Sequence, residues 1–254
     1  MQIELNSLYW PNIDPEIVRI HRKCFEHIGV PVRYTEERVR HGQWMDRVIA
    51  ERLDRDGIVG FIDIDALAYS RAAVEDAFRY VDLTQSFLGI AQSSNHLQIR
   101  THIFAAPAFL VISKQAYDTL GRPSMMPKKK GWDVAQNLSM RADALGFPYR
   151  VLYPTGFREI LPDGTVWRLG NYGHFGIGTD FDGGFFHNFL GRDGRVDILS
   201  QVANSIVADI GQPTTLPYMS RDDKLWMEGM AKPWPRPESR LDKLLLSLRR
   251  AFAR

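Results

Sequence analysis

The chain has 254 residues, of which 44% are hydrophobic and 24% are charged, and this composition excludes a disordered or fibrous protein. A formal net charge of +2 gives no global argument for nucleic-acid binding, and the single cysteine, Cys24, excludes a disulfide framework or a cysteine-rich zinc site. Neither an apolar leader nor a run of about 18 apolar residues is visible, so we expect no secretory signal, no membrane span and a cytoplasmic location.

The first 65 residues alternate between strand and helix patterns. Apolar and polar side chains alternate in the first segment, whereas the second and fourth carry apolar residues at helical spacing. Asp14 and Pro15 provide a helix cap and a first helical position. The expected order is strand, helix, strand, helix, strand, at residues 3–9, 15–28, 30–34, 41–53 and 57–65. This order predicts a doubly wound, mainly parallel α/β sheet with helices on both faces.

The strand at 57–65 ends in two carboxylates. Residues 57–62 are glycines and apolar residues, as in a buried central strand, and Asp63 and Asp65 follow at its carboxyl end. Buried carboxylates are costly unless a cation meets them, and open parallel sheets bind ligands at the carboxyl ends of their strands. The pair indicates a divalent metal or a cationic ligand, with a solvated acidic turn or helix cap as the alternative.

The middle of the chain also alternates between expected strands and helices. Ser70 and Ser113 are expected to cap helices at 71–80 and 114–120. Strands are expected at 86–91, 104–112 and 149–154, and a helix follows Asp133 with Val134, Leu138, Ala142 and Leu145 on its apolar face. A hairpin turn is expected at 161–165. The glycine-rich and aromatic segment 170–192 is interpreted as one long functional loop.

The C-terminal part differs in composition. After a helix expected at 196–210, the proline-rich segment 232–237 predicts a semi-rigid spacer. Residues 241–254 place leucines at helical spacing beside basic residues, which indicates either an amphipathic helix on an anionic membrane or a helix packed on this or another subunit. We therefore expect a main domain at 1–210, and a spacer with a helical tail at 211–254.

Four segments, taken in order, resemble glycosyltransferases of the GT-A fold, especially the family-2-like enzymes. Phe61-Ile62-Asp63-Ile64-Asp65-Ala66 resembles the DXD motif of that family. Segment 131–146, Gly-Trp-Asp-Val-Ala-Gln-Asn-Leu-Ser-Met-Arg-Ala-Asp-Ala-Leu-Gly, resembles the family's acid followed by a helix. The other two matches are residues 5–9 and 40–46. The resemblance covers residues 3–192 and leaves 193–254 unexplained.

The resemblance implies a metal-dependent transferase that moves a single sugar from a nucleotide-diphosphate sugar to a hydroxyl of a carbohydrate, lipid or other acceptor. Mn²⁺ or Mg²⁺ would be held by Asp63, Asp65 and His187, with His174 as the alternative third ligand. Asp63 would also reach the ribose or a metal-bound water. Further contacts to the nucleotide sugar are implied for Ser7, Tyr9, His41, Gly42 and Arg192.

Asp133 matches the family's general base, which takes the proton of the acceptor hydroxyl in inverting enzymes. The same residue also fits a plain helix cap, a position that Asp favours. The Gln-Xaa-Xaa-Arg-Trp motif of processive synthases is absent, which favours single transfers over polymerisation.

Two other function classes stay open. A nucleotidyltransferase would use a similar sheet, but it usually carries a glycine-rich signature near the first strand, and residues 5–15 contain no glycine. A non-catalytic GT-A-like protein that binds nucleotide or carbohydrate is the third interpretation.

Overall fold

The structure is a computed structural model of the 254-residue chain. It describes residues 3–93, 102–129, 131–159, 167–169, 174–189, 195–210 and 219–220. The expected hairpin turn at 161–165, Arg192, the proline-rich segment 232–237 and the basic helix at 241–254 lie outside these residues. The domain division at residue 210 therefore stays a prediction.

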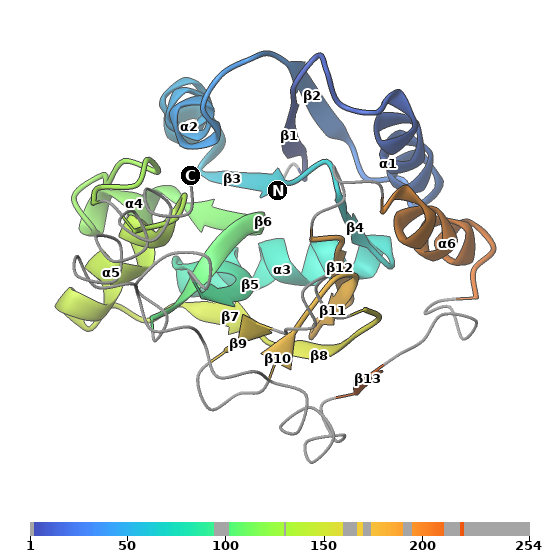
Figure 1. Ribbon diagram of the computed structural model, residues 1–254. Helices are drawn as coiled ribbons and strands as arrows, with labels where there is room; N and C mark the ends of the chain where they lie inside the picture. The colour runs from blue at the N-terminus through green and yellow to red at the C-terminus, as the bar shows by residue number, and fades with distance from the viewer. Residues whose placement is uncertain are drawn as a thin grey trace, which may run out of the picture.

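A six-stranded sheet forms the centre of the described structure (Figure 1). β1 is parallel to β2 and β3, and β5 is parallel to β7, whereas β6 runs antiparallel to both β3 and β5. The sheet is therefore mainly parallel, and the expected α/β class is confirmed. Its strands lie in the order β2 (Val32–Glu36), β1 (Leu5–Tyr9), β3 (Ile58–Ile62), β6 (Ile103–Ser113), β5 (Phe87–Ser93) and β7 (Arg150–Leu152).

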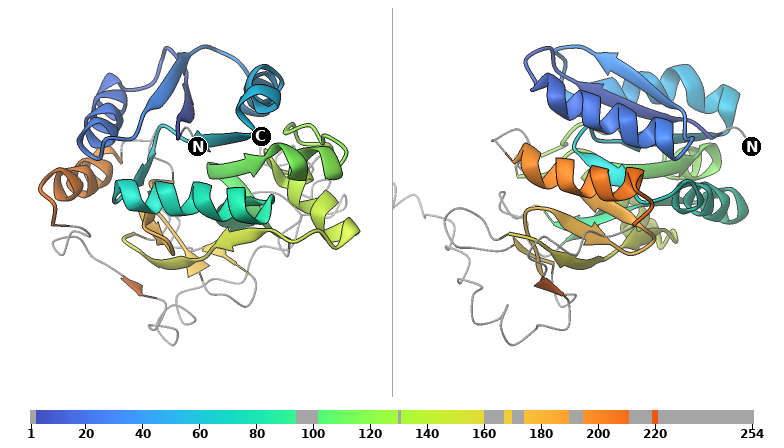
Figure 2. Two further views of the ribbon diagram at one scale, coloured as in Figure 1. Left: turned by 180° about the vertical axis from the view of Figure 1, so that it is seen from behind. Right: turned by 90° about the vertical axis from the view of Figure 1, so that its right-hand side faces the viewer.

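Helices cover both faces of this sheet because neighbouring residues of a strand point to opposite sides. Phe61 of β3 packs with the helices of one face, and its neighbour Ile62 packs with those of the other. Figure 2 shows α1 and α6 side by side on one face. That face carries α1 (Pro15–His27), α3 (Arg71–Thr84) and α6 (Val196–Val207), and the other carries α2 (His41–Asp56), α4 (Lys114–Thr119) and α5 (Gln136–Leu145).

The helix starts follow local sequence signals closely. Asp14 accepts a hydrogen bond from the Glu16 amide with Pro15 at the first position, and Ser70 and Ser113 cap α3 and α4 as expected. The expected apolar face of α5 is only partly correct, because Leu145 is 56% exposed. Within the described residues, none of the helices is both long and apolar enough to cross a membrane.

A second, smaller sheet contains much of the segment that was expected to be one long loop. That expectation is wrong for 174–187, which forms β10, β11 and β12. These strands have only two or three residues each, too few to show the alternation that reveals a strand in sequence. The sheet order is β13 (Met219–Ser220), β8 (Pro154–Phe157), β11 (Thr179–Phe181), β12 (Phe185–His187) and β4 (Ala66–Ala68), and β9 (Trp167–Arg168) pairs separately with β10 (His174–Phe175).

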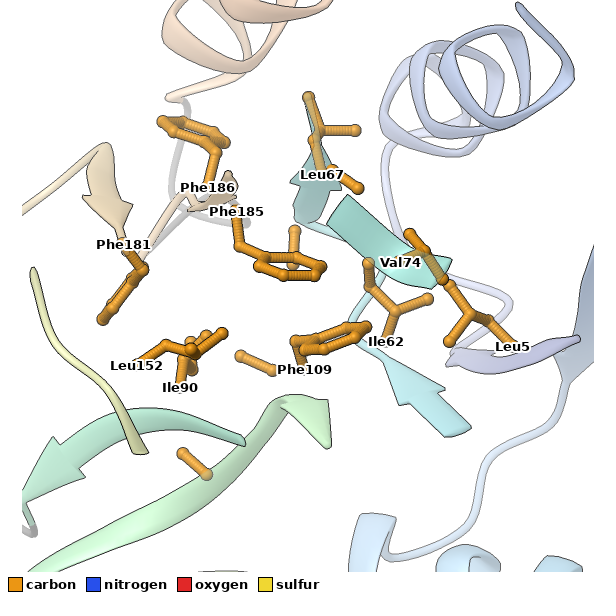
Figure 3. Close-up of a cluster of buried hydrophobic side chains, with 14 of the residues drawn as sticks. Leu5, Ile62, Leu67, Val74, Ile90, Phe109, Leu152, Phe181, Phe185 and Phe186 are labelled. Atoms are coloured by element: carbon orange, nitrogen blue, oxygen red, sulfur yellow. The ribbon is translucent and has the colours of Figure 1, made fainter. Parts of the chain in front are cut away.

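Buried aromatic side chains join the two sheets. Phe185 of β12 stacks on Phe109 of β6, with 3.9 Å between the ring centroids, and Figure 3 shows this pair among the surrounding apolar residues. Phe185 and Phe109 are 2% and 1% exposed, so the contact lies in the core rather than at a surface seam. The position of β12 is thereby tied to the main sheet.

A buried ionic network holds the second sheet together internally. The Arg158 guanidinium donates to Asp180 Oδ2 at 3.0 Å and to the Gly178 carbonyl at 2.7 Å, while the Tyr69 hydroxyl donates to Asp180 Oδ1 at 2.5 Å. Burial raises the pKa of the Asp180 carboxyl, and the adjacent Arg158 acts in the opposite direction. The network connects the ends of β4 and β8 to β11.

His21 is a fully buried side chain of α1. Its Nδ1 lies 2.8 Å from the Tyr34 hydroxyl, and its ring packs 4.5 Å from that of Phe25. Burial lowers the pKa of His21 to about 3, although the Asp65 carboxylate acts in the opposite direction. His21 is therefore neutral in the folded protein at ordinary pH.

This burial predicts a loss of stability in acid. In the unfolded chain His21 takes up a proton below its ordinary pKa of 6.5, while the folded chain does not until about pH 3. The free energy of unfolding should therefore fall below pH 6.5, with His21 contributing about 2 kcal/mol of loss by pH 5. Urea unfolding at pH 7.5 and pH 5 should show a smaller loss for His21→Gln than for the wild type. An equal loss in both proteins, with His27→Gln as the control in the same helix, would contradict this assignment.

Candidate functional site

Asp63 and Asp65 lie in the tight turn between β3 and β4. The Ala66 amide donates to the Asp63 carbonyl at 3.0 Å, and the Asp63 amide donates to the Ala108 carbonyl of β6 at 3.1 Å. Through this turn the chain leaves the main sheet and enters the second one. Both carboxylates therefore stand at the carboxyl end of β3, as the sequence predicts.

Strand pairing places His187 beside this turn. β12 pairs antiparallel with β4 so that His187 lies opposite Ala66, and the Asn188 amide donates to the Asp65 carbonyl at 2.9 Å. The His187 Nε2 lies 3.4 Å from Asp65 Oδ1. One potential ligand atom each from Asp63, Asp65 and His187 lies within 4.8 Å of the others. The structure thus brings together the three residues expected to hold a metal.

The donor set and its spacing fit a divalent cation. Two ligands that each lie about 2.1 Å from one ion are about 3 to 4.2 Å apart, depending on the angle between them. The 3.4 Å between His187 and Asp65 falls within this interval. Two carboxylates and one imidazole suit Mn²⁺, and the carboxylates with phosphate oxygens suit Mg²⁺. The side chains of His187 and Asp65 are only 9% and 12% exposed, so an ion there would lie largely away from bulk water.

The start of α2 forms the next part of the site. His41 Nε2 lies 3.5 Å from Asp63 Oδ1, and its ring lies 5.7 Å from that of Trp44. A Cβ atom on Gly42 would lie 2.7 Å from the Met125 carbonyl oxygen. Gly42 therefore permits the close approach of α2 to the segment at 125–126, which is a packing role in addition to the expected ligand contact.

The remaining residues expected at the site are Ser7, Tyr9 and Arg192 for the nucleotide and His174 as the alternative metal ligand, and they differ in accessibility. Ser7 is fully buried in β1, so its hydroxyl is not accessible to a ligand in this structure. Tyr9, at the end of β1, is partly exposed and donates to Glu36 Oε2 at 3.3 Å. The side chains of His174 and Arg192 lie outside the described part of the chain. Of these four residues, Tyr9 alone has a described side chain that solvent can reach.

Asp133 lies before α5 rather than at its first turn. The cap of α5 is Ala135, in the left-handed region with φ of 62°, and the helix begins at Gln136. The Asp133 carboxylate accepts hydrogen bonds from its neighbour's amide, Val134 N at 2.8 Å, and from Gln92 Nε2 at 3.3 Å. The expected helix after Asp133 is confirmed, but the alternative in which Asp133 is a plain helix cap is wrong, because left-handed Ala135 occupies the cap position.

A line of polar side chains supports Asp133. Gln136 Oε1 accepts from the Asp133 amide at 2.8 Å, and Gln136 Nε2 lies 3.2 Å from His102 Nδ1. His102 Nε2 in turn lies 2.7 Å from Asp143 Oδ2. The carboxylate accepts the Nε2 proton, which leaves Nδ1 to accept from Gln136 and fixes the orientation of the amide. Sequence reasoning missed Gln92, His102 and Gln136, because nothing in their local patterns marks residues that meet only after folding.

All of these groups lie along one edge of the main sheet. β1, β3 and β5 are mutually parallel and end near Tyr9, Asp63 and Gln92, and antiparallel β6 begins after His102 at the same edge. The carboxyl edge of a parallel sheet is the usual place for ligand sites in open α/β folds. The acidic pair and Asp133, which Gln92 contacts, therefore lie at the same edge of the main sheet.

The solved structures compared with this chain below have low sequence identity to it. No family model and no curated protein matches the chain. Among solved structures, a protein from STIV has 8% identity and a TM-score of 0.41, with 56% of this chain and 78% of that chain covered. A mannosyltransferase from Pyrobaculum calidifontis in complex with GDP-Man and Mn²⁺ has 14% identity and a TM-score of 0.40, with coverage of 59% and 54%. A mutant Drosophila β-1,4-galactosyltransferase 7 in complex with manganese, UDP-Gal and xylobiose has 16% identity and a TM-score of 0.36, with coverage of 58% and 64%.

The chain thus spans less than two thirds of the length of these two glycosyltransferases. TM-scores of this size establish neither a shared family nor a shared activity.

The contact at Gly42 gives a test of how the site is built. Gly42→Ala should destabilise the protein by about 1 to 3 kcal/mol, because the new methyl group meets backbone atoms of Met125 and Met126 that have little freedom to move. Alanine in an exposed helix position would instead be neutral or stabilising. Chemical denaturation measures the difference, with exposed Gln43→Ala as the control. An unchanged midpoint for Gly42→Ala would show that α2 does not approach the segment this closely.

Proposed function

We propose that this protein is a metal-dependent glycosyltransferase that moves a single sugar from a nucleotide-diphosphate sugar to an acceptor hydroxyl, with inversion. The observation that carries the proposal is the convergence of Asp63, Asp65 and His187 at the carboxyl edge of the sheet. Asp133, oriented by Gln92 and Gln136 at the same edge, supports it.

The two groups of residues divide the chemistry between them. A divalent cation bound by Asp63, Asp65 and His187 would neutralise the charge that develops on a diphosphate leaving group. Asp133 accepts the proton of the acceptor hydroxyl while that oxygen forms a bond to the anomeric carbon. The bond from this carbon to the diphosphate oxygen breaks, and the nucleoside diphosphate leaves with the electron pair. Attack on the face opposite the leaving group inverts the anomeric centre.

The orientation of Asp133 matters because a general base must lie within hydrogen-bond reach of the proton that it takes. Hydrogen bonds from the Val134 amide and Gln92 use one position on each carboxylate oxygen. Tyr9, at the end of β1, and His41, with Nε2 3.5 Å from Asp63 Oδ1, are the described side chains that we assign to the nucleotide.

The metal assignment predicts that Asp65→Asn loses the metal-dependent part of nucleotide binding. Calorimetric titration of UDP and GDP with Mn²⁺ should show tighter binding than without metal in the wild type. In Asp65→Asn that difference should fall by about tenfold or more, since one charged ligand is lost. Exposed Asp82→Asn of α3 is the matched control. Nucleotide affinity that is equally metal-dependent in Asp65→Asn and the wild type would refute the metal assignment.

The base assignment predicts a different defect for Asp133→Asn. Transfer should fall by about 10² to 10⁴-fold, because asparagine cannot take the proton, whereas the affinity for nucleotide and metal should be retained. Sugar transfer and donor hydrolysis measured with several nucleotide sugars give the rate. Metal-dependent nucleotide binding without transfer or hydrolysis in the wild type would instead favour a non-catalytic binding protein.

A further inference from the structure

A pocket of about 560 Å³ lies beside the acidic pair and Asp133. One wall is the start of α2, including Arg40 and His41, and the others are residues 126–129 together with Gly131, Trp132 and Val134. His41 also contacts Asp63, with 3.5 Å between Nε2 and Oδ1, while Trp132 and Val134 of the pocket wall flank Asp133 in sequence. The pocket therefore adjoins both the acidic pair and Asp133.

The charged residues of this pocket are all cationic. Arg40, Lys128 and Lys129 line it, and its lining contains no carboxylate among the described residues. The three side chains are exposed, and within the described ranges none of them pairs with an acidic group. Lys129 Nζ lies 5.5 Å from the ring centroid of Trp132, a cation–π contact within the pocket wall. Three cations that have no carboxylate partner among the described residues favour an anionic occupant, with which they can form charge-assisted hydrogen bonds.

The uncharged groups of the pocket also offer hydrogen-bond donors. No side chain caps the start of α2, so its first amides are available to a ligand at the positive end of the helix dipole. Trp132 is 9% exposed, and its buried indole Nε1 has no hydrogen-bond partner among the described residues. The amides at the start of α2 are therefore the uncharged donors that a ligand in this pocket can reach.

We propose that this pocket binds an anionic group of phosphate type that belongs to the acceptor substrate. The assignment of this group to the acceptor substrate rests on the proposed glycosyltransferase function, whereas the preference for an anion rests on the residues of the pocket alone. The leaving diphosphate of a donor is already assigned to the cation held by Asp63, Asp65 and His187. The wall formed by the two neighbours of Asp133 places the pocket next to the residue that receives the acceptor proton.

The test uses glycerol 3-phosphate as the probe, because it combines a phosphate with free hydroxyls, and glycerol as its neutral match. Saturation-transfer NMR on the full chain in EDTA should show binding of glycerol 3-phosphate and none of glycerol. Lys128→Ala/Lys129→Ala should weaken this binding at least tenfold, by the loss of two charge-assisted contacts. The control is Lys23→Ala/Arg79→Ala, which removes the same charge from exposed helix positions outside the pocket and should bind the probe like the wild type.

A second titration separates the acceptor from the donor. UDP or GDP with Mg²⁺ should bind the double lysine variant as tightly as the wild type. Loss of nucleotide affinity with unchanged binding of glycerol 3-phosphate would assign these lysines to the donor and overturn the proposal. Equal binding of glycerol and glycerol 3-phosphate, or equal loss in the control variant, would also overturn it. If the proposed glycosyltransferase function is wrong, the wild type should bind neither UDP nor GDP with Mg²⁺. The glycerol 3-phosphate titration in EDTA is independent of that outcome, so the two failures can be told apart.

Discussion

The candidate site depends above all on the pairing of β4 with β12. The turn at Asp63 to Asp65 carries the chain out of the main sheet, and β4 then continues as the edge of the second sheet. β12 joins that edge in a register that places His187 opposite Ala66. Since a shift of one residue turns every side chain of a strand to the other face, this register decides whether the imidazole meets the carboxylates.

The register is itself held by the core beneath it. Phe185, two residues before His187, stacks on Phe109 of the main sheet, and the next strand, β11, is fixed by Asp180 and Arg158. A buried ion pair of this kind contributes little net stability but penalises alternative arrangements, because either partner alone would be a buried, uncompensated charge. These contacts hold the small sheet in place where it presents His187, although its strands are short.

The charges around Asp63 and Asp65 favour a bound cation. Asp63 and Asp65 place two negative charges within one turn. The nearest imidazole nitrogens are His41 Nε2, 3.5 Å from Asp63 Oδ1, and His187 Nε2, 3.4 Å from Asp65 Oδ1. At these distances neither imidazole forms a strong hydrogen bond that would neutralise the charge. His21, on the neighbouring helix, is held neutral by its burial. On the other side of His41 the pocket carries only positive charge. Acidic side chains thus lie on one side of His41 and basic side chains line the pocket on the other.

The sequence by itself determined the features that depend on near neighbours. Local patterns predicted the buried strand before Asp63, the helix caps at Asp14, Ser70 and Ser113, and the α/β class. They could do so because capping and apolar alternation act over two to four residues. His187 was expected only through a family resemblance, and its strand was mistaken for a loop. The tertiary structure alone decided that His187 stands beside Asp65, that Gln92 and His102 support Asp133, and that Ser7 is buried. These outcomes depend on strand register and on the packing of one sheet against another, which join residues far apart in the chain and leave no periodic signal in it.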